Sequence, residues 1–179
     1  MKTIIFLFLF LITTSASFSQ IFMTRNGRVS FYSSTEKETI NAVNNQAYAV
    51  IDAGKKNIAF TLLMKGFQFD KELMQEHFNE NYAESDKYPK ASFNGAYTGD
   101  INAAKDGVYN VVAKGNLTIH GVTKSIEAPA TIEVKSGALT GKTEFKIKPE
   151  DYGINIPSLV REKIAKEMTI SVSANCSPK

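Results

Sequence analysis

The stretch that decides the fold is I-E-A-P-A-T-I-E-V-K-S-G-A-L-T-G-K-T-E-F-K-I, residues 126–147. Apolar side chains occupy every second position from Ile126 to Val134, and most positions between them carry charged or hydroxyl side chains. Most odd positions from Leu139 to Ile147 repeat the pattern. Because side chains alternate between the two faces of a strand, this pattern predicts two strands that each have one buried face. Ser136-Gly137 between them favours a tight hairpin turn.

The same period recurs along most of the chain from residue 27 onward. Even positions from Met168 to Ala174 are apolar, and further strands are expected near 28–34, 46–52, 56–65, 91–98 and 108–120. Turn dipeptides such as His120-Gly121 separate them. About eight long strands that tilt by about 40° can close into a barrel, which removes exposed edges. The sequence therefore predicts an all-β fold with a single antiparallel eight-stranded lipocalin-like β-barrel.

One segment departs from this pattern and indicates a helix that caps the barrel. Asp70 can cap a helix that runs through about Asn79. Its apolar stripe, at helical spacing, consists of Leu73, Met74, His77 and Phe78. The sequence also allows a second short helix after Pro157, over 158–165, with three inward side chains: Leu159, Val160 and Ile164.

The first residues have the features of a cleaved export signal. Lys2 precedes nine apolar residues, Ile4 to Ile12, and Ser17-Phe18-Ser19 has the small-x-small spacing of a cleavage site before Gln20. Nine apolar residues are far fewer than the roughly twenty that span a bilayer, so no stable membrane anchor is expected. We expect residues 1–19 to be removed, and 20–179 to form the barrel domain in the periplasm or outside the cell.

Composition narrows the partners further. Cys176 is the only cysteine, so no disulfide can form within the chain. Lys and Arg number 21 and Asp and Glu 18, and the charges are scattered, which argues against nucleic acid as a partner. The oligomeric state stays open.

Catalytic and metal-binding motifs are sparse. The two histidines, His77 and His120, have no partner at the spacing that a zinc site requires, so no metal or other cofactor is expected. We interpret His77 as a residue on the inner face of the helix and His120 as a turn residue. No nucleophile elbow or phosphate-binding glycine loop is present. The sequence thus favours a protein that is not an enzyme.

The many aromatic residues suggest a role for the barrel interior. A barrel of about eight strands either packs solid or leaves room for one ligand, and an apolar lining selects an apolar one. We expect an apolar small molecule, namely an isoprenoid, quinone-like or fatty-acyl lipid, in a cavity lined by Phe60, Leu62, Phe67, Phe69, Leu73, Phe78, Phe93, Tyr97, Ile119, Phe145 and Ile147.

Three motifs resemble the family of YceI-like proteins. They are G-N-L-T-I-H-G-V-T-K at 115–124, Y-P-K-A-S-F-N-G at 88–95 and the segment 145–154, which ends in D-Y-G-I. The resemblance implies a lipocalin-like barrel in the periplasm that holds a polyisoprenoid chain. Many members have a histidine near the position where Lys65 stands here, and the helix motif resembles that of a divergent branch.

Three functional interpretations remain open. An exported carrier of an apolar ligand requires an internal cavity. An interaction module that binds a protein or glycan through its surface would have a solid interior and an exposed apolar patch. An enzyme would require polar groups that converge in a pocket, and His77 with Glu76 or Tyr82 is the cluster available for that role.

Overall fold

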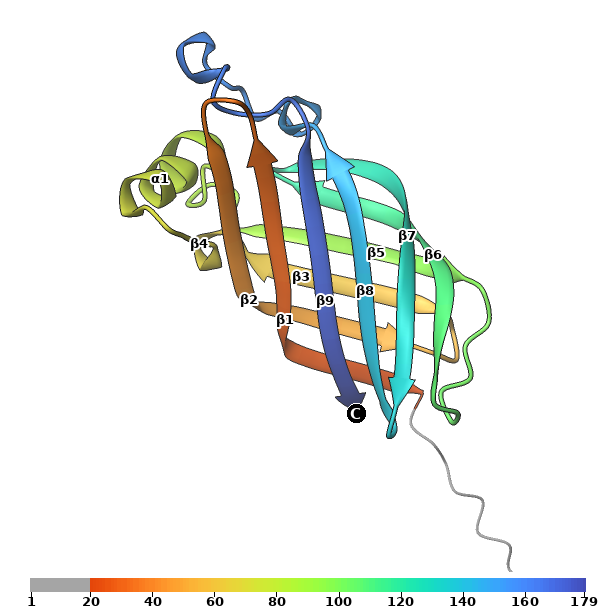
Figure 1. The fold of residues 1–179 in the computed structure, drawn as a ribbon. Coiled ribbons are helices and arrows are strands. Elements are labelled where there is room, and N and C mark those ends of the chain that lie inside the picture. Colours follow the sequence, from red (N-terminus) through yellow and green to blue (C-terminus); the bar gives the residue numbers. More distant parts are fainter. Residues whose placement is uncertain (1–19) are drawn as a thin grey trace, which may run out of the picture.

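The protein is a closed β-barrel, described by a computed structural model over residues 20–179 (Figure 1). Each barrel strand is antiparallel to its neighbours, in the order β1-β9-β8-β7-β6-β5-β3-β2, and β2 pairs back to β1. This confirms the predicted all-β, eight-stranded barrel. The strands are β1 (Ile21–Ser34), β2 (Thr39–Asp52), β3 (Asn57–Leu63), β5 (Lys90–Thr98), β6 (Gly107–Ile119), β7 (Val122–Lys135), β8 (Ala138–Ile147) and β9 (Met168–Pro178). The two-residue strand β4 (Gln68–Phe69) extends the sheet beside β2.

The first two strands are longer than the sequence pattern indicated. β1 and β2 each have 14 residues, whereas we expected 28–34 and 46–52. The register of β1 against β2 shifts between Thr24 and Gly27 and again before Val29. A bulge adds a residue and breaks the period of two, which is why alternation alone missed this part of β1.

β3 ends at Leu63, two residues earlier than expected, because the chain turns away at Met64–Gly66. Asn44 holds this turn in place: its side chain is fully buried, and its side-chain nitrogen donates to the Leu63 carbonyl at 2.9 Å. A Cβ at Gly66 would lie 2.6 Å from that nitrogen, so only glycine fits there. The turn directs the chain into β4 and then into the helix.

The predicted inward faces of β8 and β9 are confirmed. Phe145 and Ile147 of β8 line the interior, as do Ile170 and Val172 of β9. Glu144 and Lys146 on the opposite face of β8 are exposed. Strict alternation sets this result because one face of a closed barrel must be apolar.

Two hydrophobic clusters fill the ends of the barrel. The first, which we call the closed-end core, lies near the chain's C-terminus and includes Phe22, Tyr97, Ile132, Leu139 and Cys176. The second, the helix-end core, lies beneath the helix and includes Val29, Phe31, Ile40, Leu62 and Met64. The interior between them holds the cavity described below.

β5 and β6 approach each other unusually closely where Gly95 pairs with Gly115. A Cβ on Gly95 would lie 2.3 Å from the carbonyl oxygen of Lys114, and one on Gly115 would lie 2.4 Å from that of Asn94. Both glycines are therefore required for this crease, which lies between the cavity residue Phe93 and the core residue Tyr97.

The capping helix is present but begins later than expected. α1 (Glu72–His77) continues into a π turn, Phe78–Tyr82, so that the helical segment has 11 residues. The expected cap at Asp70 is wrong. Lys71 occupies the N-cap position in an extended conformation, without a side-chain capping bond, because the preceding residues pair with β2.

The second expected helix, over 158–165, is only a 3₁₀ turn at Ser158–Val160. Leu159 is 91% exposed, so its predicted inward orientation is wrong. The backbone N–H of Ala165 donates to the buried Ser33 hydroxyl at 2.9 Å, which draws the segment onto β1 instead of into a helix. Val160 and Ile164 face the cavity as expected.

We predict that Gly95→Ala lowers the free energy of unfolding by about 3 kcal/mol, because the new methyl group collides with backbone atoms that cannot yield without opening the sheet. Gly141→Ala is the matched control: its Cβ would lie 3.4 Å from the end of the Ile51 side chain, an ordinary contact. Urea unfolding of both variants measures the difference. Equal effects of the two substitutions would contradict the requirement for a close approach.

We also predict an alkaline loss of stability caused by Cys176. Burial raises the pKa of its thiol from 9.0 to about 11. A raised folded-state pKa stabilises the fold fully below pH 9, and this contribution is lost as pH rises through about 11. Between pH 8 and pH 11, wild type should lose about 2 kcal/mol more than Cys176→Ala in urea unfolding. Parallel pH profiles of the two proteins would refute this.

Candidate functional site

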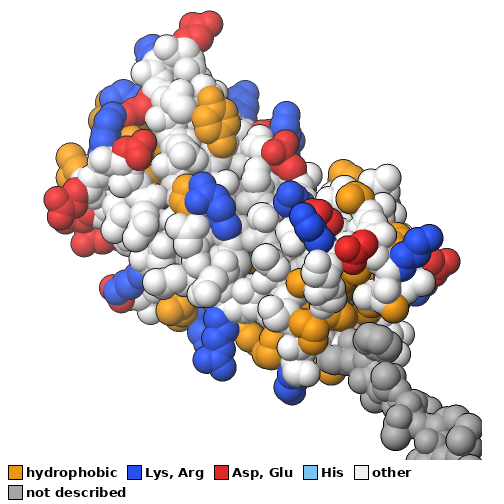
Figure 2. Space-filling model, turned by 60° about the horizontal axis from the view of Figure 1, so that its bottom comes forward, with side chains coloured by type: hydrophobic (Ala, Val, Ile, Leu, Met, Phe, Trp, Pro, Cys, Tyr) orange, Lys and Arg blue, Asp and Glu red, His pale blue; other side chains and the backbone are white. Residues whose placement is uncertain are grey.

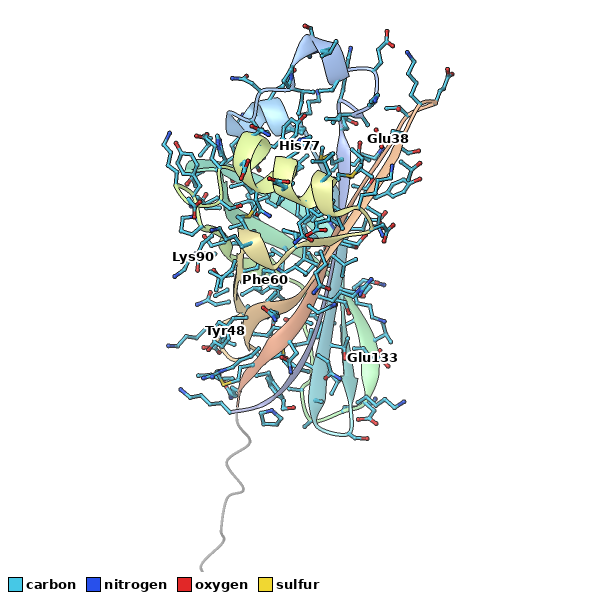
Figure 3. All side chains as sticks on the ribbon, turned by 90° about the vertical axis from the view of Figure 1, so that its left-hand side faces the viewer. Glu38, Tyr48, Phe60, His77, Lys90 and Glu133 are labelled. Carbon is cyan, nitrogen blue, oxygen red and sulfur yellow. The ribbon has the colours of Figure 1, made fainter. Side chains whose placement is uncertain are left out.

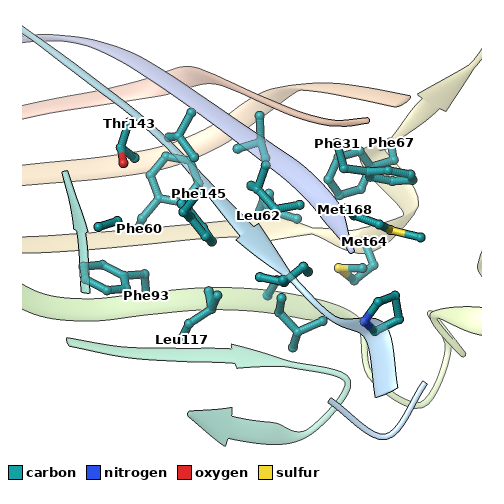
Figure 4. A pocket seen from close by; sticks show the side chains of 18 of the residues that line it. Phe31, Phe60, Leu62, Met64, Phe67, Phe93, Leu117, Thr143, Phe145 and Met168 are labelled. Carbon is teal, nitrogen blue, oxygen red and sulfur yellow. The ribbon is translucent and has the colours of Figure 1, made fainter. Parts of the chain in front are cut away.

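An elongated cavity of about 550 Å³ occupies the barrel between the two cores (Figure 4). Each of the eight barrel strands contributes inward side chains to its wall. On β6 the lining extends from Val111 to Ile119, which corresponds to about 26 Å along the strand and about 20 Å along the barrel axis at a tilt of about 40°. The cavity is therefore long and narrow.

The structure places ten of the eleven predicted lining residues on this cavity. Those ten are Phe60, Leu62, Phe67, Phe69, Leu73, Phe78, Phe93, Ile119, Phe145 and Ile147. Tyr97 is the exception. It has the predicted inward phase, but it lies four residues beyond Phe93, about 13 Å along β5, and is buried in the closed-end core. Alternation assigns a residue to a face and does not assign its height in the barrel.

Several lining residues were not predicted. Leu117, Ile126 and Ile170 lie on the inward phase of their strands, so the alternation signal was available for them. Pro149, Ile154 and Ile156 belong to the segment after β8, which has no period, and only the folded chain brings them to the cavity.

Four phenylalanine rings fasten the helical segment to the barrel. Phe31 of β1 contacts the rings of Phe67, Phe69 and Phe78 at centroid distances of 5.4, 5.6 and 5.5 Å. Phe78 also contacts Phe67 and Phe69 at 5.7 and 5.1 Å. Because such ring pairs add to the burial of apolar area, this cluster holds the helix end of the cavity in place.

Polar residues of the lining gather where the helix crosses the barrel, as Figure 3 shows for His77 and Glu38. Lys71 forms an ion pair with Glu38 at 3.1 Å, between the helix N-cap and the turn that joins β1 to β2. Leu73 lines the cavity there and is also 62% exposed. This end is the mouth of the cavity, and its rim is charged.

Deeper in the cavity, the polar side chain of Thr143 is already paired. Thr143 faces inward, and its hydroxyl donates to the Pro129 carbonyl at 2.7 Å. Across residues 20–179, no buried side-chain nitrogen or oxygen lacks a hydrogen-bond partner. Most of the side chains that line the cavity are apolar, so a ligand that enters the interior meets mainly apolar surface.

The clusters considered for chemistry do not assemble. No group of three His, Cys, Asp or Glu side chains that could hold a metal ion occurs within the described part of the chain. His77 is exposed, and over the same residues no side-chain hydrogen bond joins it to Glu76 or Tyr82. His120 lies in a turn as expected, with both ring nitrogens hydrogen-bonded.

Two further findings concern the outer surface. Figure 2 shows Lys and Arg side chains interspersed with Asp and Glu on the face near residue 20. Among residues 20–179, no helix is long and apolar enough to cross a membrane. The expected signal peptide, residues 1–19, lies outside the described residues.

Comparisons with known proteins agree with this geometry. A polyisoprenoid binding domain from Saccharophagus degradans has the same fold with a TM-score of 0.77, 12% identity and coverage of 90% of this chain and 99% of that chain. BcnA of Burkholderia cenocepacia matches with a TM-score of 0.70 and 16% identity over 84% of this chain and 96% of its own. A Campylobacter jejuni YceI protein matches with a TM-score of 0.55 and 19% identity, over 97% and 92%.

No curated protein matches the sequence. The family model of the YceI-like domain, in contrast, matches residues 13–176, which is nearly the whole chain. The protein therefore belongs to the YceI-like domain family.

Proposed function

We propose that this protein is an exported carrier that holds one apolar chain molecule, of the isoprenoid, quinone-like or fatty-acyl class, along the axis of its barrel. The observation that carries the proposal is the elongated cavity of about 550 Å³, whose lining is mostly apolar. This volume lies within the roughly 300–1,000 Å³ typical of small-molecule sites. At roughly 30 Å³ for each water molecule in the liquid, the cavity has the volume of about eighteen water molecules.

Burial of an apolar chain supplies enough free energy for this role. About fifteen methylene groups contribute roughly 12 kcal/mol at about 0.8 kcal/mol each. Association costs some 4–6 kcal/mol at the lower end of the usual range, which leaves an affinity near micromolar. The ligand needs no polar anchor in the interior.

The relatives support a binding role in general. One structural neighbour is a polyisoprenoid binding domain, and the chain shares its fold. At 12% identity this likeness concerns the fold, so the ligand class for this chain rests on the cavity. The alternative interpretation, an interaction module with a solid interior, lacks the support that the cavity gives to the carrier.

Export is part of the proposal and rests on residues 1–19 alone. N-terminal sequencing of the protein from cell fractions of its host tests it directly. A mature chain that begins at Gln20 in the periplasmic or secreted fraction is expected. Retention of Met1 in the cytoplasm would exclude it.

The ligand is best sought in protein purified from its own host. Native mass spectrometry should detect one bound molecule per barrel, and organic extraction should release it for identification as a lipid. Apolar chains of similar length and width would support selection by shape alone. A polar metabolite, or an empty barrel that takes up no apolar probe, would contradict the carrier role.

We predict that Leu62→Trp weakens binding of cis-parinaric acid, a fluorescent fatty acid, at least tenfold. Leu62 is 6% exposed and faces the cavity, so a larger ring takes space that the chain needs. Leu63→Trp on the same strand is the matched control, because Leu63 is 54% exposed and points outward. Fluorescence titration gives both affinities, and circular dichroism verifies the fold. Equal affinities of the two variants would place the probe outside the cavity.

A further inference from the structure

The barrel wall is incomplete on one side of the cavity. β7 pairs with β8 only from Ala130 to Lys135, and the last pair toward the helix end is Ala130 with Thr143. On the other flanks, β6 pairs with β7 as far as Val122, and β9 pairs with β8 as far as Ile147. Residues 122–129 of β7 and 144–147 of β8 therefore face each other across a gap without a ladder, and Figure 1 shows these two strands diverging.

The sequence explains why the ladder stops at this point. Pro129 lies one position beyond Ala130 toward the helix end of β7, and it has no N–H to donate to β8. Its carbonyl points toward β8, because it accepts a hydrogen bond from the Thr143 hydroxyl at 2.7 Å. This side-chain bond closes the lower end of the gap and leaves the strands free to separate above it.

A short segment covers the gap. We call residues 149–156, which follow β8, the flap. Pro149, Ile154 and Ile156 of the flap line the cavity together with Ile126 of β7 and Phe145 of β8. The backbone hydrogen bonds that its N–H groups make, such as Ile154 to Pro149 at 3.1 Å and Gly153 to Glu150 at 3.1 Å, are local to the segment. The flap is thus a lining element outside the barrel's hydrogen-bond ladder.

His120 fastens the flap to the turn between β6 and β7. Its Nδ1 lies 3.1 Å from the Tyr152 carbonyl oxygen, and its Nε2 lies 2.6 Å from a carboxylate oxygen of Glu84. A ring with a proton on each nitrogen donates to both. The Tyr88 ring packs on the imidazole at 4.3 Å, and Lys124 pairs with Asp151 of the flap at 3.3 Å.

Glu84 adopts a backbone conformation that glutamate rarely accepts, with φ of 43°. Strain of this kind persists where the surroundings require one orientation of the side chain. Here the orientation brings the carboxylate to His120, so three segments meet at one imidazole: the end of the helical region, the β6–β7 turn and the flap.

The gap offers an apolar ligand an easier route than the mouth does. At the mouth, the Lys71–Glu38 pair stands on the rim, and four packed phenylalanine rings hold the helix. At the gap, both strand edges and the flap present apolar side chains to the cavity. Opening the gap exposes the buried flap side chains Tyr152 and Ile156 but breaks no β7–β8 ladder.

We propose that the gap between β7 and β8 is the passage through which the apolar ligand enters and leaves, that the flap closes it, and that His120 is the positioning residue that holds the flap shut. The passage of a ligand rests on the proposed carrier function. The movement of the flap does not, so the two can be tested apart.

The first experiment compares two reducible tethers. Lys124→Cys with Asp151→Cys, joined by a bis-methanethiosulfonate linker, ties the flap to β7 where an ion pair now stands. Lys37→Cys with Glu162→Cys ties the β1–β2 turn to the loop beyond the flap, also in place of an ion pair. Dissociation of cis-parinaric acid should slow at least tenfold with the flap tether and recover on reduction, and the control tether should change it less than twofold. A flap tether that leaves the rate unchanged would overturn the passage.

The second experiment needs no ligand. Ala128 lines the cavity on β7 beside the gap and is 3% exposed, so Ala128→Cys reports access of a maleimide to the interior. Adding His120→Ala should speed its modification at least tenfold, and Glu84→Gln should speed it less. Buried Cys176 supplies the slow background, measured without Ala128→Cys.

Thr118→Val is the control for general loosening, since it removes a 2.8 Å hydroxyl contact with Thr123 on the same hairpin without touching the flap. It should leave the labelling rate within twofold. Equal acceleration by Thr118→Val and His120→Ala, or none by His120→Ala, refutes the latch. If the protein binds no probe while His120→Ala still speeds labelling of the thiol introduced by Ala128→Cys, the carrier function fails and the gate stands.

Discussion

Closure of the barrel is the constraint on which the rest of the structure depends. Once β1 pairs with both β2 and β9, the circumference is fixed by the number of strands and their stagger, and with it the width of the interior. An inward side chain must be apolar or have its hydrogen bonds satisfied within the protein, because burial of an unpaired polar group costs free energy. Hydrophobic clusters pack toward both ends of the barrel, and inward rings such as Phe60 and Phe93, which lie side by side on β3 and β5, line the cavity.

The polar groups follow from the same constraint. Inside the barrel, Asn44 and Thr143 serve the fold. Asn44 anchors the turn after β3, and the Thr143 hydroxyl donates to the Pro129 carbonyl where the β7–β8 ladder ends. Since both are satisfied internally, neither is available to a ligand. Selection in such a cavity then depends on length and width, which a narrow apolar space imposes on a chain molecule more strongly than on a compact one.

The wall is not uniform, and the departure can be traced to single residues. Pro129 ends a ladder that the neighbouring strand pairs continue, and a flap without ladder bonds takes over as the wall. His120 joins that flap to two other segments with two hydrogen bonds, so a few atoms hold three lining residues, Pro149, Ile154 and Ile156, in place. Regions of this kind open at a lower free-energy cost than a continuous sheet.

The sequence by itself determined the fold class and the phase of each strand, because alternation is a local property that the chain carries before it folds. Ten of the eleven predicted lining residues lie on the cavity. Six of them, Phe60, Leu62, Phe93, Ile119, Phe145 and Ile147, follow from the strand phase, and Leu73 and Phe78 follow from the helical stripe. Only the tertiary structure decided that Tyr97 belongs to the closed-end core, that Lys71 and not Asp70 precedes the helix, that Leu159 faces solvent, and that the flap completes the wall. Each of these depends on which strands pair, where pairing stops and how far along the axis a residue lies, and such contacts between distant residues leave no period in the sequence.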